Sequence, residues 1–354
     1  MPLSLSASQL ADFNRDGFLI IPAVLTQQDL SEIRSAMAAR VVDLLQRYQR
    51  LGRGNGSVGT DTAADFSTNI THLLQIAPEA YQHIDISLPM LHDLAACLPD
   101  WQALFGDAWR DEAGIYADAS IFSLVSHPNI VALAQQILGE EVMASPVQHV
   151  RIKPPQNLLT GSAAIDANTA RTLWHQDEAV VTEEARGVDI LTVWVAISDA
   201  TLENGCMQAV AGSHTAADVA DIADFGLARH CPGKGDLVGE IYIPEETVAA
   251  LPRTPLLANA GDVVLLHKRT LHGAGANESN GVRWSFDMRY QALGTPSGRE
   301  HFPSAIVASH NAAEIVQHAQ QYRQRWLQAR DAILDGSVTA EFNSRWNKYA
   351  PICA

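Results

Sequence analysis

A regular alternation of apolar and polar side chains over residues 282 to 292 limits the folds that this chain can adopt. Side chains on a β-strand point alternately to its two faces. One face carries Val282, Trp284, Phe286, Met288 and Tyr290, and the other carries Arg283, Ser285, Asp287, Arg289 and Gln291. A strand with two such faces needs an apolar layer on one side. Its polar face is a candidate lining for a barrel.

Short β-rich runs fill the chain from about residue 142 to residue 292. They cover 147–152, 172–175, 189–197, 263–267 and 282–292. Helical patterns lie on both sides of this region. We therefore predict a mostly β core with flanking helices. The chain is expected to form one domain over 1–354, with a helical part at about 1–140, a barrel at about 142–292 and a helical part at about 311–350.

Individual helices can be placed from their end signals. Ser6 and Thr26 are positioned to begin helices, and Gly17 ends the first of them. Further helices are predicted over 89–98, 128–138 and 312–334. Three irregular stretches, 52–61, 156–170 and 215–239, are candidate lids.

The overall charge excludes some partners. The chain has 24 Lys and Arg against 40 Asp and Glu, a formal net charge of −16. Such a charge opposes attraction to nucleic acid and to anionic membranes. The four cysteines form no C-x-x-C pair, and neither a signal peptide nor a transmembrane stretch is evident. We expect a cytoplasmic protein.

Three residues have the chemistry of a metal centre. A strand alternates its side chains, so His175 and Asp177, which are two residues apart, would project from the same face. His272 follows the apolar run 263–266 and is the best candidate for a third ligand. Two imidazoles and one carboxylate form the set that suits non-haem Fe(II) and leaves positions open. His267 is the competing histidine and is interpreted as structural.

The chain resembles the phytanoyl-CoA dioxygenase family of Fe(II)/2-oxoglutarate oxygenases, most clearly over about 147–291. Besides the metal ligands, the resemblance rests on 16–22, on Asn204-Gly205 and on Gly212-Ser213-His214. It implies a double-stranded β-helix, a jelly-roll-like barrel with iron at its mouth. It also implies Fe(II), 2-oxoglutarate and O2 as cofactor and co-substrates.

The resemblance carries over four co-substrate residues. Arg283 lies eleven residues after His272, where the family places the arginine that binds the distal carboxylate of 2-oxoglutarate. Thr192, Lys153 and His149 are placed near the co-substrate by the same likeness. The family often has a hydroxyl residue two positions after the distal histidine, and this chain has Ala274 there. That departure puts one hydrogen bond to the co-substrate in question.

Structural alternatives remain for each of these residues. Arg283 could instead form an ion pair with Asp287, and Lys153 could be a solvated residue at a strand end. Thr192 could serve packing alone, as β-branched residues on strands often do. His149 could pack or could support a neighbour of the metal.

The predicted function is oxidation of a small molecule, most commonly hydroxylation, with release of succinate and CO2. Desaturation, ring formation and epimerisation would use the same oxidant, whereas Asp177 disfavours halogenation. A noncatalytic metal- or metabolite-binding barrel and an iron oxygenase that does not use 2-oxoglutarate are the alternatives. The substrate and the oligomeric state cannot be read from the sequence.

Overall fold

Two antiparallel sheets form the centre of the computed structural model, which describes residues 3–54, 66–86, 94–160, 169–215, 227–233, 241–338 and 351–353. The larger sheet has the order β1 (Phe18–Ile21), β10 (Val263–His267), β5 (Ile190–Ala196), β12 (Arg283–Ala292), β2 (Val142–Ala144) and β13 (Ala305–Ala308), and β3 (His149–Lys153) also pairs with β12. The smaller sheet has the order β4 (Thr172–His175), β11 (His272–Ala274), β6 (Met207–Ala209) and β9 (Thr254–Leu256). A short pair, β7 (Cys231–Pro232) and β8 (Ile241–Tyr242), lies beside them.

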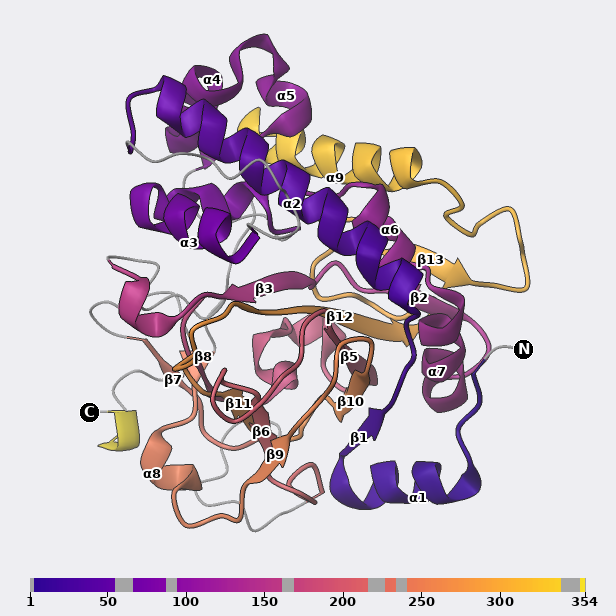
Figure 1. Ribbon diagram of the computed structural model, residues 1–354. Helices are drawn as coiled ribbons and strands as arrows, with labels where there is room; N and C mark the ends of the chain where they lie inside the picture. The colour runs from indigo at the N-terminus through magenta and orange to yellow at the C-terminus, as the bar shows by residue number, and fades with distance from the viewer. Residues whose placement is uncertain are drawn as a thin grey trace.

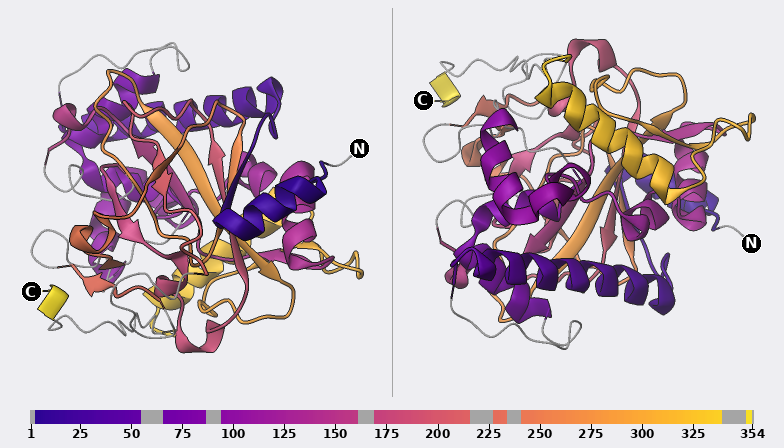
Figure 2. Two further views of the ribbon diagram at one scale, coloured as in Figure 1. Left: turned by 90° about the horizontal axis from the view of Figure 1, so that it is seen from below. Right: turned by 90° about the horizontal axis from the view of Figure 1, so that it is seen from above.

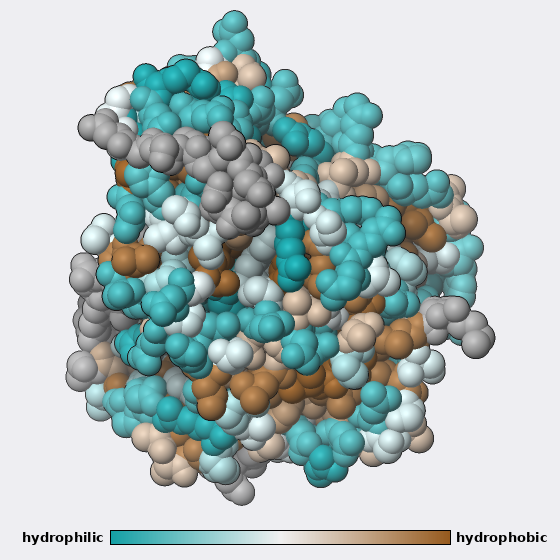
Figure 3. Space-filling model, in the orientation of Figure 1, coloured by the Kyte–Doolittle hydropathy of each residue, from teal (hydrophilic) through white to brown (hydrophobic). Residues whose placement is uncertain are grey.

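The two sheets pack against each other through one apolar cluster. It includes Trp194 and Ala196 of β5, Val264 and Leu266 of β10, Met207 and Ala209 of β6, Leu256 of β9 and Ala274 of β11. Phe18 and Ile20 on the edge strand β1 are only partly buried against this cluster. Figure 3 shows a band of apolar surface in the lower half of the face where Figure 1 places β1 and β9. The predicted double-stranded arrangement is confirmed, as two facing sheets that do not close into a continuous barrel within the described residues.

A layer of helices covers the other face of the larger sheet (Figures 1 and 2). It contains α2 (Gln27–Arg50), α3 (Phe66–Ile76), α4 (Leu98–Phe105), α5 (Trp109–Glu112), α6 (Ala119–Val125), α7 (Pro128–Leu138) and α9 (Ala319–Leu334). The apolar face of β12 packs into this layer, because Trp284, Phe286, Met288 and Tyr290 share one buried cluster with the apolar stripe of α2. The alternation in 282–292 therefore separates a helix-facing side from an inward polar side. Two further helices, α1 (Ala7–Asp16) and α8 (Glu245–Val248), lie outside the layer.

Several predicted helix ends are confirmed. Ser6 and Thr26 each form a complete capping box, at the starts of α1 and α2. Gly17 ends α1 in the left-handed conformation, with φ of 78°. Gly139 follows the last residue of α7, where the sequence predicts the end of that helix.

Two predicted helices are wrong in their bounds. Pro99 does not follow a helix but lies in the first turn of α4, a position that tolerates proline because its missing N–H has no partner there. Of the predicted 89–98 helix, residues 89–93 lie outside the described part, and Leu94–Cys97 forms a 3-10 turn. The last helix begins at Ala319 instead of residue 312, because 309–315 forms a turn held by Ser309 and Asn311.

The expectation that no stretch is long and apolar enough to span a membrane needs correction, because residues 119–138 meet that criterion by length and composition. The structure divides it into α6 and α7 before Pro128. Ile121, Leu124, Ile130 and Leu133 are buried in the main core. The apolar side chains of α6 and α7 therefore pack into the core between the helices and the larger sheet.

Candidate metal centre

The three predicted metal ligands converge at one side of the smaller sheet, on the edge strand β4, its neighbour β11 and the turn that follows β4. His175 is the last residue of β4 and His272 the first of β11, and the two are directly paired. The sequence predicts that the strand geometry extends to Asp177. Instead, Asp177 is the first residue of a 3-10 turn. Its carboxylate lies 3.6 Å from His175 Nε2 and 3.9 Å from His272 Nε2. The candidate ligand atoms all lie within 4.8 Å of one another, as one shared ion requires.

Both histidines are held in the orientation that a ligand needs. His175 Nδ1 lies 2.8 Å from the carbonyl of Leu173, and His272 Nδ1 lies 2.9 Å from the carbonyl of Thr270. A carbonyl only accepts, so each Nδ1 carries the proton and each Nε2 keeps its lone pair. Burial and the neighbouring His175 lower the pKa of His272 to about 4. At neutral pH this imidazole is therefore neutral and able to bind a metal.

The Asp177 carboxylate is buried and fixed through both oxygens. Oδ2 accepts a hydrogen bond from the Thr192 hydroxyl, and Oδ1 accepts one of 2.6 Å from Arg289 Nη2. Burial alone would raise the pKa of Asp177, but Arg289, His272 and His175 hold it well below its usual range. Thr192 therefore contacts a candidate metal ligand directly, a more specific position than the sequence predicts.

Arg283 lies on the inward polar face of β12, where the fit of 2-oxoglutarate can be tested. Its side chain is fully buried, and within the described part of the chain Nε and Nη1 have no hydrogen-bond partner. Asp287 does not neutralise it, because that carboxylate bonds to Arg151 at 2.7 Å. Burial lowers the pKa of Arg283 to about 10, so it stays protonated at neutral pH. A buried guanidinium with spare donors fits an incoming carboxylate.

The groups around Arg283 also favour an anion. Lys153, the cross-strand partner of Arg283, is buried and donates to Thr172 Oγ1 at 3.1 Å. Thr172 is paired with Ala274, so a hydroxyl stands opposite the position where the family often has one. Ser285 Oγ and Trp194 Nε1 are further buried donors with no partner among the described residues. The residues present therefore fit a bound dicarboxylate.

His149, the fourth predicted co-substrate residue, pairs with Asp287 across the larger sheet and also contacts a carboxylate from the helical part of the chain. Its Nδ1 lies 3.3 Å from Asp85, whose other oxygen accepts the backbone N–H of Val150. His149 thus connects β3 to the helical part of the chain. Its structural interpretation is the one that these contacts favour.

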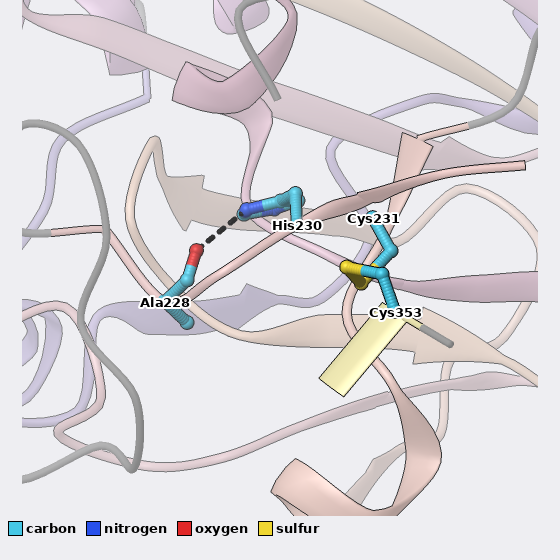
Figure 4. The surroundings of a disulfide bond; sticks show 4 residues. All are labelled: Ala228, His230, Cys231 and Cys353. Carbon is cyan, nitrogen blue, oxygen red and sulfur yellow. Dashed lines mark hydrogen bonds between the residues drawn. A yellow bond between two sulfur atoms is a disulfide. The ribbon is translucent and has the colours of Figure 1, made fainter. Parts of the chain in front are cut away.

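Gln176, between the two ligands His175 and Asp177, is held by His230 and Ala228, which the sequence analysis did not identify. The backbone N–H of Gln176 donates to His230 Nε2 at 3.0 Å, and the Gln176 side chain accepts from the backbone N–H of Ala228 at 2.9 Å. His230 Nδ1 in turn lies 2.7 Å from the carbonyl of Ala228 (Figure 4). No local pattern marks His230, which is 54 residues from Gln176. Most of the candidate lids, 55–61, 161–168, 216–226 and 234–239, lie outside the described residues.

Cys231, next to His230, forms a disulfide with Cys353 near the end of the chain (Figure 4). The spacing of the cysteines did not predict it. Cross-linking residues 122 apart removes much of the freedom of the unfolded chain. We expect Cys353→Ser to lower the free energy of unfolding by about 2 to 4 kcal/mol. Urea denaturation of the oxidised protein measures this, and a reductant should lower wild-type stability but not that of the variant.

His267, the competing histidine, lies outside the ligand cluster. Its Nδ1 accepts from the backbone N–H of Arg269, and its ring lies 5.0 Å from that of His214. Burial, with His214 and Lys268, lowers its pKa from 6.5 to about 4. The structural interpretation of His267 agrees with these contacts.

A depressed histidine pKa predicts a pH dependence of stability. Between pH 6.5 and 4 the unfolded chain binds the proton that folded His267 excludes, so the free energy of unfolding falls as the pH falls through this window. His267→Gln should make this fall shallower. Urea titrations at pH 7, 5.5 and 4.5 measure the slope, and an unchanged slope would contradict the assignment.

The chain matches a known protein family and is similar to several known proteins. The model of the family described as phytanoyl-CoA dioxygenase matches residues 13–285. Phytanoyl-CoA dioxygenase domain-containing protein 1 of Bos taurus is 25% identical over 303 residues, covering 82% of this chain and 92% of its own length. The L-proline trans-4-hydroxylase of Streptomyces griseoviridis is 27% identical over 162 residues, 44% of this chain and 57% of its own. The crystal structure of the non-haem α-ketoglutarate-dependent carbocyclase SnoK is 21% identical, with a TM-score of 0.47, covering 88% of this chain and 91% of its own.

Proposed function

Because the chain belongs to the phytanoyl-CoA dioxygenase family and is therefore a non-haem iron and 2-oxoglutarate oxygenase, we propose that it hydroxylates a small-molecule substrate. The proposed iron ligands are His175, Asp177 and His272. The observation that carries the proposal is that this buried cluster occurs together with Arg283, a buried cation whose Nε and Nη1 lack a partner in the described structure. Hydroxylation is also the activity named for the proline hydroxylase relative.

The proposed reaction converts a substrate C–H bond, O2 and 2-oxoglutarate into a C–OH group, succinate and CO2. Iron supplies the activation of O2 when it is bound by the three ligands, which leave half of its coordination sphere open. Arg283 would bind the distal carboxylate of 2-oxoglutarate through two parallel hydrogen bonds. Lys153 and Thr172 would hold the same end of the co-substrate.

Thr192 and the two backbone carbonyls would act through the ligands. The carbonyls of Leu173 and Thr270 fix the protons of His175 and His272 on Nδ1, which directs the Nε2 lone pairs inward. Thr192 holds Oδ2 of Asp177. Charge also favours the co-substrate: Lys153 and Arg283 pair across β3 and β12 and are buried, whereas Arg151 and Arg289 are engaged by Asp287 and Asp177.

An anaerobic titration tests the proposal. The Fe(II)-loaded protein is titrated with 2-oxoglutarate while the metal-to-ligand charge-transfer absorption is followed. A saturable band supports 2-oxoglutarate binding at iron and justifies a substrate screen by succinate release with product mass analysis. If iron binds without a band, an iron oxygenase that does not use 2-oxoglutarate becomes the better account. If no iron binds, the noncatalytic barrel does.

Localisation stays a prediction. We propose the cytoplasm, on the composition of the chain. Disulfides are rare in that compartment, so the state of Cys231 and Cys353 bears directly on the proposal. Thiol trapping in intact cells would detect either state.

A further inference from the structure

We propose that Arg289 is a positioning residue that fixes the Asp177 carboxylate for one-oxygen binding of the metal. This inference rests on the proposed function of the cluster as an iron site. Arg289 is on β12, 112 residues from Asp177 in sequence, yet its Nη2 lies 2.6 Å from Asp177 Oδ1. Among the described residues, this is the shortest ion pair that any of the three candidate ligands forms.

Arg289 is itself held by a buried chain of charges. Its Nη1 lies 3.6 Å from Asp287 Oδ1, and Asp287 Oδ2 accepts from Arg151 at 2.7 Å. All three side chains lie on the inward face of the larger sheet. Asp287 and Arg289 are two residues apart on β12 and so share that face, and Arg151 is on the adjacent β3. Nη1 also donates to the carbonyl of Val147 at 3.4 Å, so the guanidinium cannot turn away from Asp177 without losing these contacts.

The contact limits how Asp177 can bind a metal. Arg289 takes Oδ1 while Thr192 takes Oδ2, so the carboxylate plane is fixed from two directions. A carboxylate free to rotate can chelate an ion through both oxygens and occupy one more position. Held in place, Asp177 would take one position, which leaves three for 2-oxoglutarate and O2.

A positioning role and a purely electrostatic role of Arg289 predict opposite changes in metal affinity when the residue is replaced, so the two can be distinguished. The positive charge of Arg289 repels a metal cation, so a purely electrostatic role predicts tighter metal binding after its removal. Loss of a group that orients a ligand commonly weakens metal binding by about 10- to 100-fold. We expect the second effect, because the hydrogen bond at 2.6 Å directs the only carboxylate of the three ligands.

The test compares Arg289→Met and Arg289→Lys with the wild type by anaerobic calorimetry with Co(II), an oxidation-resistant substitute for Fe(II). We expect Arg289→Met to weaken Co(II) binding about 10- to 100-fold, and Arg289→Lys to weaken it less because the ammonium keeps one donor. The visible absorption of bound Co(II) should also change, since its intensity depends on coordination number. Arg330→Lys is the matched control, a buried arginine on α9 that bonds to the carbonyl of Ala113; it should bind Co(II) as the wild type does.

The outcomes separate this role from the proposed function. Unchanged or tighter Co(II) binding by Arg289→Met, with an unchanged spectrum, overturns the positioning role and leaves the iron site intact. A wild type that binds neither Fe(II) nor Co(II) overturns both. If Arg289→Met fails to fold, Asp287→Asn releases Arg289 from its second partner and should weaken binding to a smaller extent; unchanged affinity there and in Arg289→Lys also overturns the role.

Discussion

Replacing Arg283 with alanine is expected to weaken 2-oxoglutarate binding to the Fe(II)-loaded protein by about 100- to 1000-fold. Arg283 is fully buried, and its spare donors face no carboxylate within the described part of the chain. Losing one partner of a buried, hydrogen-bonded charge pair costs about 3 to 4 kcal/mol, and each 1.4 kcal/mol is a factor of ten. Titration of the charge-transfer band without O2 measures the dissociation constant.

Iron binding separates this effect from general damage. Arg283 is not among the three candidate ligands, so Arg283→Ala should bind Fe(II) within about threefold of the wild type. Arg283→Lys should fall between the two proteins, since it keeps the charge but loses the two-donor fork. Arg34→Ala serves as the control: Arg34 is a partly buried arginine that bonds to the carbonyl of Ile197. Wild-type affinity for 2-oxoglutarate in Arg283→Ala would place the distal carboxylate elsewhere.

Removing a histidine ligand is expected to weaken metal binding by about 100-fold or more. Structural metal sites bind with roughly 10 to 16 kcal/mol shared among three or four ligands, so one ligand contributes about 3 kcal/mol or more. His175→Ala and His272→Ala should therefore lose the charge-transfer band at metal concentrations that saturate the wild type. They should also lose the rise in melting temperature that the metal produces, because that rise depends on affinity.

The chain offers a matched histidine for comparison. His267 lies five positions before His272, at the end of β10, and bonds to backbone instead of entering the cluster. His267→Gln should bind Fe(II) as tightly as the wild type. The ligand assignment fails if His272→Ala keeps wild-type affinity, and it fails equally if His267→Gln loses it.

Much of the fold was predictable because it depends on local patterns. Alternation over 282–292 predicted a strand with an apolar and a polar face, and β12 buries the first against helices and turns the second inward. Capping boxes at Ser6 and Thr26 predicted two helix starts. Helix bounds failed where a local signal has two meanings, as at Pro99, which can follow one helix or begin another.

The candidate site was predictable only in part. His175 and Asp177 are close in sequence, and a known ligand set suggested His272 as their partner. The support around them was not predictable: Arg289 reaches Asp177 across 112 residues, and His230 reaches Gln176 across 54. Arg289 was visible as one of five polar side chains on β12, but nothing in the alternation distinguished it from Arg283.

Local patterns were therefore enough to predict which face of β12 is apolar, where two helices begin and which side chains can bind a metal, because these follow from periodicity and side-chain chemistry. Only the tertiary structure decided the pairings: Arg289 with Asp177, His230 with Gln176, and Cys231 with Cys353. The physical reason is that such contacts depend on strand order and register. These bring distant segments side by side and leave no trace in the residues next to either partner.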